Sequence, residues 1–159
     1  GQPPEIREAQ LLTSRHVSNT AMAVTIDCGD ADDIHPANKE PVGQRLALAA
    51  RAIAYGESIE YAGPVFERLE LEGARAVLHF THTESGLVAP GGVLEGFSVA
   101  ASDGVFHPAH ASIVGETVVV TAPAVPQPAA VRYGWANVPQ GNLYNRAGLP
   151  ASPFRTDVN

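Results

Sequence analysis

Three carboxylates and one histidine follow one another closely in the segment GDADDIHP, residues 29–36. In hydrolases that use a Ser/His/Asp set, the imidazole takes the proton of the nucleophile. A carboxylate bonded to its other ring nitrogen fixes the tautomer and stabilises the imidazolium. The spacing Asp32-x-x-His35 lets one loop supply both groups, so it predicts a general base at His35. A solvated loop whose aspartates cap the next helix would have the same composition, and this alternative is equally open.

The segments on either side of this loop have the patterns of an α/β layer. Residues 3–16 carry Pro4 at a first helical position and apolar residues at helical spacing, which predicts a helix. The apolar run AMAVTID, residues 21–27, predicts a short strand covered on both faces. A second helix is expected to open at Pro36 and to end at Gly56. The acidic loop would then follow the carboxyl end of a strand, where the active groups of α/β layers gather.

The chain changes character near residue 57, where short strands separated by glycine turns begin. Residues 65–71 and 75–82 predict a hairpin, and several further strands follow it. Strands at this regular spacing suggest a β-sandwich, and we expect residues 141–159 to pack as an extended tail. The predicted fold class is therefore α/β plus all-β, with two parts at residues 1–57 and 58–159.

Composition narrows the classes of partner. Hydrophobic residues make up 45% of the chain and charged residues 17%, which is typical of a folded protein with a core. The net charge of −7 argues against a general affinity for nucleic acid or for anionic membrane surfaces. The longest apolar stretch, RLALAARAIAY, is interrupted by arginine and is too short to span a bilayer. A small neutral substrate is compatible with all of these features.

The longer stretch MAVTIDCGDADDIHPANKEPVGQRLALAARAIAYG resembles the end of the catalytic domain of sialate O-acetylesterases and their bacterial relatives. These are carbohydrate esterases of the SGNH (GDSL-like) hydrolase superfamily. The resemblance continues through YAGPVFERLEL, LEGFSVAASDGVFHPAHASIVGETVVV, AVRYGWAN and NLYNRAGLPASPFRTD, so it covers nearly the whole chain. It implies a serine esterase that removes O-acetyl groups from sugars. It also implies that residues 1–57 end an SGNH α/β/α hydrolase domain and that residues 58–159 form a β-sandwich-like domain.

The resemblance places His35 on the family's catalytic histidine. Two carboxylates compete as its partner, because the D-x-x-H spacing points to Asp32 whereas the acid of the family's DIHP block falls on Asp33. The family's serine nucleophile lies in an early block resembling G-Q-S-N, which this sequence does not contain. We therefore expect a C-terminal portion of a longer esterase, inactive without the N-terminal part that bears the nucleophilic serine. The resemblance also implies a secreted or periplasmic protein.

Other residues with reactive side chains are expected to serve the structure. His79 and His82 stand three apart on a predicted strand and should point to opposite faces, so we expect no metal site there. The serine–histidine mechanism needs no cofactor. The acidic neighbours of Cys28 should raise the pKa of its thiol, which favours a packing role. Arg45 and Arg51 are expected to be surface or domain-interface charges rather than substrate clamps.

A second class of function is compatible with the sequence: a non-catalytic carbohydrate-binding or scaffolding β-sandwich formed by residues 58–159. Trp135, Tyr133 and Tyr144 could form an aromatic platform for a sugar ring. The same residue types are equally suited to the core and to interfaces. The esterase interpretation takes an O-acetylated sugar as substrate, and loss of activity on removing His35 would separate the two interpretations.

Overall fold

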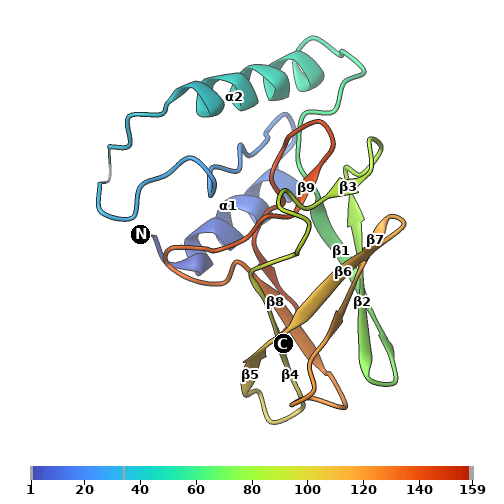
Figure 1. The fold of residues 1–159 in the computed structure, drawn as a ribbon. Coiled ribbons are helices and arrows are strands. Elements are labelled where there is room, and N and C mark those ends of the chain that lie inside the picture. The colour runs from blue at the N-terminus through green and yellow to red at the C-terminus, as the bar shows by residue number, and fades with distance from the viewer. Residues whose placement is uncertain (1, 34, 158–159) are drawn as a thin grey trace.

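The computed structural model describes residues 2–33 and 35–157 (Figure 1). Two helices come first, α1 (Pro4–His16) and α2 (Glu40–Ile53). The strands follow in the order β1 (Val65–Glu72), β2 (Arg75–Thr81), β3 (Leu87–Val88), β4 (Phe97–Ala100), β5 (Phe106–Pro108), β6 (His110–Val114), β7 (Thr117–Thr121), β8 (Ala130–Tyr133), β9 (Tyr144–Asn145) and β10 (Phe154–Arg155). Figure 1 shows α2 at one end of the molecule, β4 and β5 at the other, and α1 between them. Both helices precede the strands of the described residues, whereas the sequence predicts a strand at residues 21–27 between them. The mixture of helices and antiparallel sheets agrees with a mixed α/β fold.

Both helices form, but the second begins later than predicted. Pro4 occupies the first turn of α1. Proline has no backbone N–H group, and this costs nothing in the first turn because N–H groups there have no partner within the helix. The prediction that the second helix opens at Pro36 is wrong, because α2 begins at Glu40. Pro41 explains the shift: within a helix it would lose a hydrogen bond and collide with the carbonyl four residues earlier, so it is tolerated only in the first turn. Neither helix of the described residues is long and apolar enough to cross a membrane.

Two four-stranded sheets share one hydrophobic core. Their strand orders are β1-β2-β7-β6 and β10-β8-β4-β5, a third sheet pairs β3 with β9, and every pairing is antiparallel. Leu78 and Val120 of the first sheet and Val99, Val131 and Tyr133 of the second are fully buried in the same cluster. The predicted hairpin is confirmed as β1 and β2. In β2, alternate residues Ala76, Leu78 and Phe80 belong to the core, which is the expected period of two. A register shift in β1 places Phe66 and Leu69, three residues apart, against the same core.

The predicted strand at residues 21–27 is not formed. Residues 20–25 have no regular secondary structure, and a turn follows them. A strand needs a neighbour that pairs with its backbone N–H and C=O groups. Among the described residues, no strand lies beside this segment to provide that pairing. Residues 21–27 therefore have the apolar sequence of a strand but lack the backbone hydrogen bonds to a neighbouring strand that would form one.

Helix α1 is fastened to the sheets by charged side chains. Arg155 of β10 binds Glu8 through two parallel hydrogen bonds of 2.9 and 2.8 Å. Arg7 donates to both backbone carbonyls of residues 136–137, at 2.9 and 2.7 Å, and Arg15 donates to a carbonyl of β1. Bidentate arginine–carboxylate pairs fix orientation as well as distance. Residues from the start of the chain are thus attached to its last strand.

Candidate functional site

The acidic loop is folded by its own aspartates. Oδ1 of Asp30 accepts hydrogen bonds from the backbone N–H groups of Asp32 (2.8 Å) and Asp33 (3.3 Å). Oδ1 of Asp33 in turn accepts from the backbone N–H of His35 at 2.7 Å. Aspartates commonly close turns in this way, by bonding to N–H groups two or three residues ahead. Two of the three carboxylates therefore hold the backbone that leads to the histidine.

His35 is exposed to solvent, as are both of its candidate partners. Within the described residues, no hydrogen bond links the His35 ring to Asp32 or Asp33. The bond that does exist joins Asp33 to the backbone of His35. The carboxylate of Asp32 makes no hydrogen bond in the described part of the chain. The structure thus brings the three residues onto one exposed loop.

A cavity of about 460 Å³ opens beside this loop. Asp32 and Asp33 line one side of it, and Arg7 of α1 and Asn137 of the β8–β9 connection line another. His35 does not line this cavity. The loop therefore faces an opening that polar and apolar side chains from two parts of the chain line together.

A partly buried ion pair fixes the point where the acidic loop begins. The guanidinium of Arg45 on α2 donates to both carboxylate oxygens of Asp27, at 2.7 and 2.6 Å, and to the backbone carbonyl of Val24 at 2.6 Å. Arg45 is only 8% exposed. Arginine suits such a position because its planar fork matches a carboxylate with two parallel bonds. The helix and the segment before the loop are thereby locked to each other.

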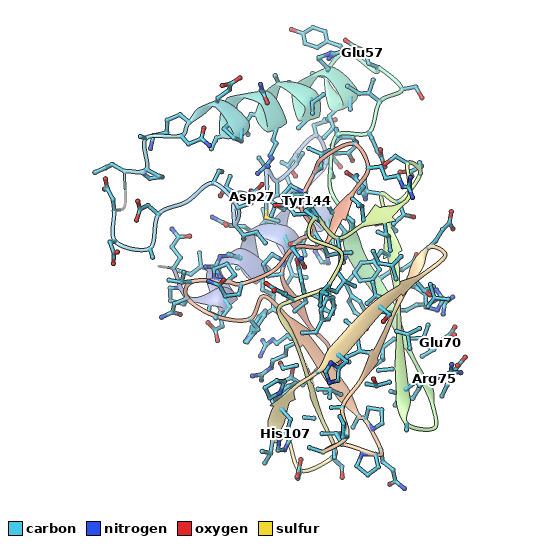
Figure 2. The ribbon with its side chains drawn as sticks, viewed as in Figure 1. Asp27, Glu57, Glu70, Arg75, His107 and Tyr144 are labelled. Atoms are coloured by element: carbon cyan, nitrogen blue, oxygen red, sulfur yellow. The ribbon has the colours of Figure 1, made fainter. Side chains whose placement is uncertain are left out.

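Tyr144 of β9 completes this cluster from the other end of the chain. Its hydroxyl donates to Oδ2 of Asp27 at 3.2 Å, and Figure 2 shows the two side chains together below α2. Burial alone would raise the pKa of Asp27, but the hydrogen bonds and charge of Arg45 hold it below its usual value. Burial, with the charge of Asp27, raises the pKa of Tyr144 to about 12. Asp27 is therefore ionised and Tyr144 is a neutral donor at neutral pH.

The remaining reactive side chains have structural surroundings. Cys28 is buried, and burial together with the charge of Asp27 raises the pKa of its thiol, so the predicted packing role is supported. Arg51 pairs with Glu57 on the surface at 2.6 Å, whereas Arg45 is the interface charge just described. Among the described residues, no group of three histidine, cysteine or acidic side chains could hold a metal ion.

The aromatic platform suggested by the sequence is not assembled. Tyr133 is fully buried, where its hydroxyl accepts from the backbone N–H of Leu143 at 2.9 Å. Tyr144 is directed to Asp27, and Trp135 packs 4.9 Å from the guanidinium of Arg155. Packing in the core and at internal interfaces, which was the alternative interpretation, therefore accounts for all three.

Sequence reasoning missed the cluster of Asp27, Arg45 and Tyr144, although one signal was available. Arg45 lies three residues after Val42 and four before Ala49, on the apolar side of α2. A charge on an apolar helix face indicates a partner, because burying it unpaired is costly. The identity of the partner was not readable from the sequence, since Tyr144 approaches from a distant part of the chain.

Comparison with known proteins confirms the resemblance to sialate O-acetylesterases. The chain is 41% identical over 91 residues to the sialate O-acetylesterase of Mus musculus and 39% identical over 89 residues to that of Homo sapiens. These matches cover 51% and 50% of this chain. The chain spans only 17% of the length of each of these relatives. No family model matches the chain.

A solved structure is similar over almost the whole chain. It is the crystal structure of a carbohydrate acetylesterase from Xanthomonas citri, with 49% sequence identity and a TM-score of 0.93. The match covers 98% of this chain and 36% of that protein. Because it extends over the helices and the strands together, it supports their relative arrangement as well as each part.

Proposed function

We propose that this chain is the C-terminal part of a carbohydrate O-acetylesterase and that it supplies the general base, His35. The observation that carries the proposal is an exposed His35 on a loop with Asp32 and Asp33, in a chain 49% identical to a carbohydrate acetylesterase. The names of the relatives favour an O-acetylated sugar as the substrate. Within that class, sialic acid is the sugar that the curated relatives suggest.

In the proposed mechanism, a serine outside these 159 residues attacks the acetyl carbonyl while His35 takes its proton. The bond between the acetyl carbon and the sugar oxygen breaks, and the imidazolium returns the proton to that oxygen. Water then attacks the acetyl-serine, with His35 again as the base, which releases acetate and restores the serine. The residues of this chain contribute the proton transfers and the orientation of the imidazole.

Asp32 is the better candidate for the carboxylate that orients His35. Asp30 and Asp33 already accept backbone N–H groups of the loop, so their positions are explained by the turn. Asp32 has no such role in the described residues and is three positions before the histidine.

The proposal includes the division of the chain. Residues 1–57 would complete an SGNH-type α/β/α domain, and residues 58–159 would form a β-sandwich-like domain. The two sheets that share one core support the second assignment. The apolar segment 21–27 would pair as a strand once the rest of the sheet is present. A secreted or periplasmic location is part of the proposal and rests on the resemblance alone.

The test uses the full-length protein, with acetate release from an O-acetylated sialic acid as the assay. His35→Ala should lower kcat by about three orders of magnitude or more. Asp32→Asn should lower it by about two to four orders. Asp33→Asn removes the charge but keeps an oxygen that can accept the backbone N–H of His35, so it should cost about tenfold or less. His107→Ala is the matched control, because His107 lies at the opposite end of the molecule from α2 (Figure 2).

Each outcome decides one part of the proposal. If His35→Ala retains hydrolysis within a few fold, His35 is not the base. If Asp33→Asn costs more than Asp32→Asn, the partner is Asp33. Strong hydrolysis by residues 1–159 alone would contradict the requirement for a serine from elsewhere.

A further inference from the structure

We propose that Tyr144 is a positioning residue for His35 and that it acts through Asp27 and Arg45. The inference rests on the proposed function, since it takes His35 as the catalytic base. It assigns a role in the reaction to the β-rich part, which otherwise contributes no residue to the proposed chemistry. The argument follows the chain of contacts from the core of the sheets to the acidic loop.

The first step is the rigidity of Tyr144. Its neighbours Leu143 and Asn145 are both fully buried. The N–H of Leu143 donates to Tyr133, and Oδ1 of Asn145 accepts from the N–H of Leu149. Because successive side chains of an extended segment point to opposite sides, the two buried neighbours direct Tyr144 away from the core. Its hydroxyl is therefore presented at a fixed point.

The second step is the capture of Asp27 at that point. Oδ2 of Asp27 receives the Tyr144 hydroxyl at 3.2 Å and the guanidinium of Arg45 at 2.6 Å. The Asp27 side chain is 20% exposed and that of Arg45 is 10% exposed, so water competes weakly for these groups. One carboxylate is thus held between helix α2 and strand β9. Without Tyr144, the ion pair would persist but would lose its direct bond to the β-rich part.

The third step leads from Asp27 to His35. Asp30, three residues after Asp27, and Asp33 close two successive turns, and the second turn binds the backbone N–H of His35. We infer that a shift of Asp27 relative to the sheets displaces the short segment that follows it as far as His35. Catalysis is sensitive to such displacements, because misplacing a reacting group by about 1 Å costs about a hundredfold in rate.

The role is one of positioning rather than of stability. Tyr144 contributes a single long hydrogen bond, and its removal leaves all three short bonds of Arg45 in place. The fold should therefore tolerate Tyr144→Phe. The rate should not, because the origin of the acidic loop is then free to shift relative to the sheets.

The experiment compares Tyr144→Phe with Tyr55→Phe in the full-length protein. Tyr55 is 78% exposed and is the matched control. Tyr144→Phe should lower kcat by about threefold to tenfold with KM unchanged. The loss should be the same for an O-acetylated sugar and for p-nitrophenyl acetate, since the base serves both. Titration of active sites with an organophosphorus reagent corrects for any inactive fraction.

A second readout separates positioning from a general loss of structure. Urea unfolding measures the stability of each variant beside its kcat. Tyr144→Phe should keep the wild-type free energy of unfolding within about 1 kcal/mol while its kcat falls. Arg45→Lys, which keeps the charge but loses the paired bonds, should lower kcat more strongly than Tyr144→Phe.

The outcomes distinguish this inference from the proposed function. A Tyr144→Phe protein with wild-type kcat would overturn the inference, provided that His35→Ala is inactive. If the wild-type protein releases no acetate, or if His35→Ala retains activity, it is the proposed function that fails. A change in KM alone would also overturn the inference, because it would assign Tyr144 to substrate binding.

Discussion

Removing Arg45 tests whether the ion pair beneath α2 holds the structure together. In Arg45→Met, the carboxylate of Asp27 keeps only the Tyr144 hydroxyl as a side-chain partner, and the carbonyl of Val24 loses its donor. Breaking a fully buried pair costs about 3–5 kcal/mol. Because the Asp27 side chain is 20% exposed, we expect the lower end, about 3 kcal/mol. For a chain of this length, that corresponds to a fall in Tm of about 6–12 °C.

The pH dependence of the loss has a definite sign. Arg45 holds the pKa of Asp27 below its usual value, so the wild-type stabilisation is present at neutral pH and is lost as the pH falls through that lowered pKa. In Arg45→Met, burial raises the pKa of Asp27 instead, and the carboxylate is neutralised at a higher pH. The difference between the two proteins should therefore be largest near neutral pH and should shrink on acidification.

Urea unfolding followed by circular dichroism measures this difference at about pH 7 and about pH 4. The double variant Arg45→Met/Asp27→Leu removes both charges and should be no less stable than either single variant. The sum of the single losses should then exceed the double loss by at least about 2 kcal/mol. A single loss below about 1 kcal/mol, unchanged by pH, would refute the reasoning and show that the pair is effectively solvated.

Two further predictions concern packing and reactivity. Gly63→Ala should cost about 3 kcal/mol in unfolding free energy, because the new Cβ would lie 2.0 Å from the carbonyl oxygen of Pro150. In Gly43→Ala of α2, the new Cβ meets no atom within 4 Å, so the free energy of unfolding should rise by about 0.5–1 kcal/mol. Equal changes in the urea unfolding of Gly63→Ala and Gly43→Ala would contradict both predictions. Cys28, buried and with a raised pKa, should react at least about tenfold more slowly than free cysteine with a disulfide reagent at neutral pH. A rate equal to that of free cysteine would show that the thiol is accessible.

The sequence correctly predicted α1 and the hairpin of β1 and β2, because interactions between residues close in the chain determine both. The helix at residues 3–16 formed because Pro4 opens it and its apolar residues recur at helical spacing. The first hairpin formed because its two strands carry alternating patterns around the tight turn at Gly73, which has a φ of 60°. The start of α2 was mispredicted because Pro36 was weighed without Pro41, whose steric demand decides the boundary.

Properties that depend on distant partners were not predictable in the same way. The apolar run at residues 21–27 has the composition of a strand, but strand formation depends on a neighbour that local sequence does not specify. The spacing of its residues predicted the acidic loop. It could not predict that Asp30 and Asp33 accept backbone N–H groups and that Asp32 does not, because these bonds depend on the conformation of the loop. The contact of Asp27 with Tyr144 joins the first third of the chain to its last tenth and has no local signature.

The attachment of α1 to the last strand limits how this protein can be rearranged. Glu8 and Arg155 come from opposite ends of the chain and hold each other by two bonds. Replacing residues 58–159 with an unrelated module would therefore remove Arg155, the cation that binds Glu8. It would also expose the side of α1 that these residues cover. The two parts are therefore not interchangeable unless this contact is rebuilt in the new module.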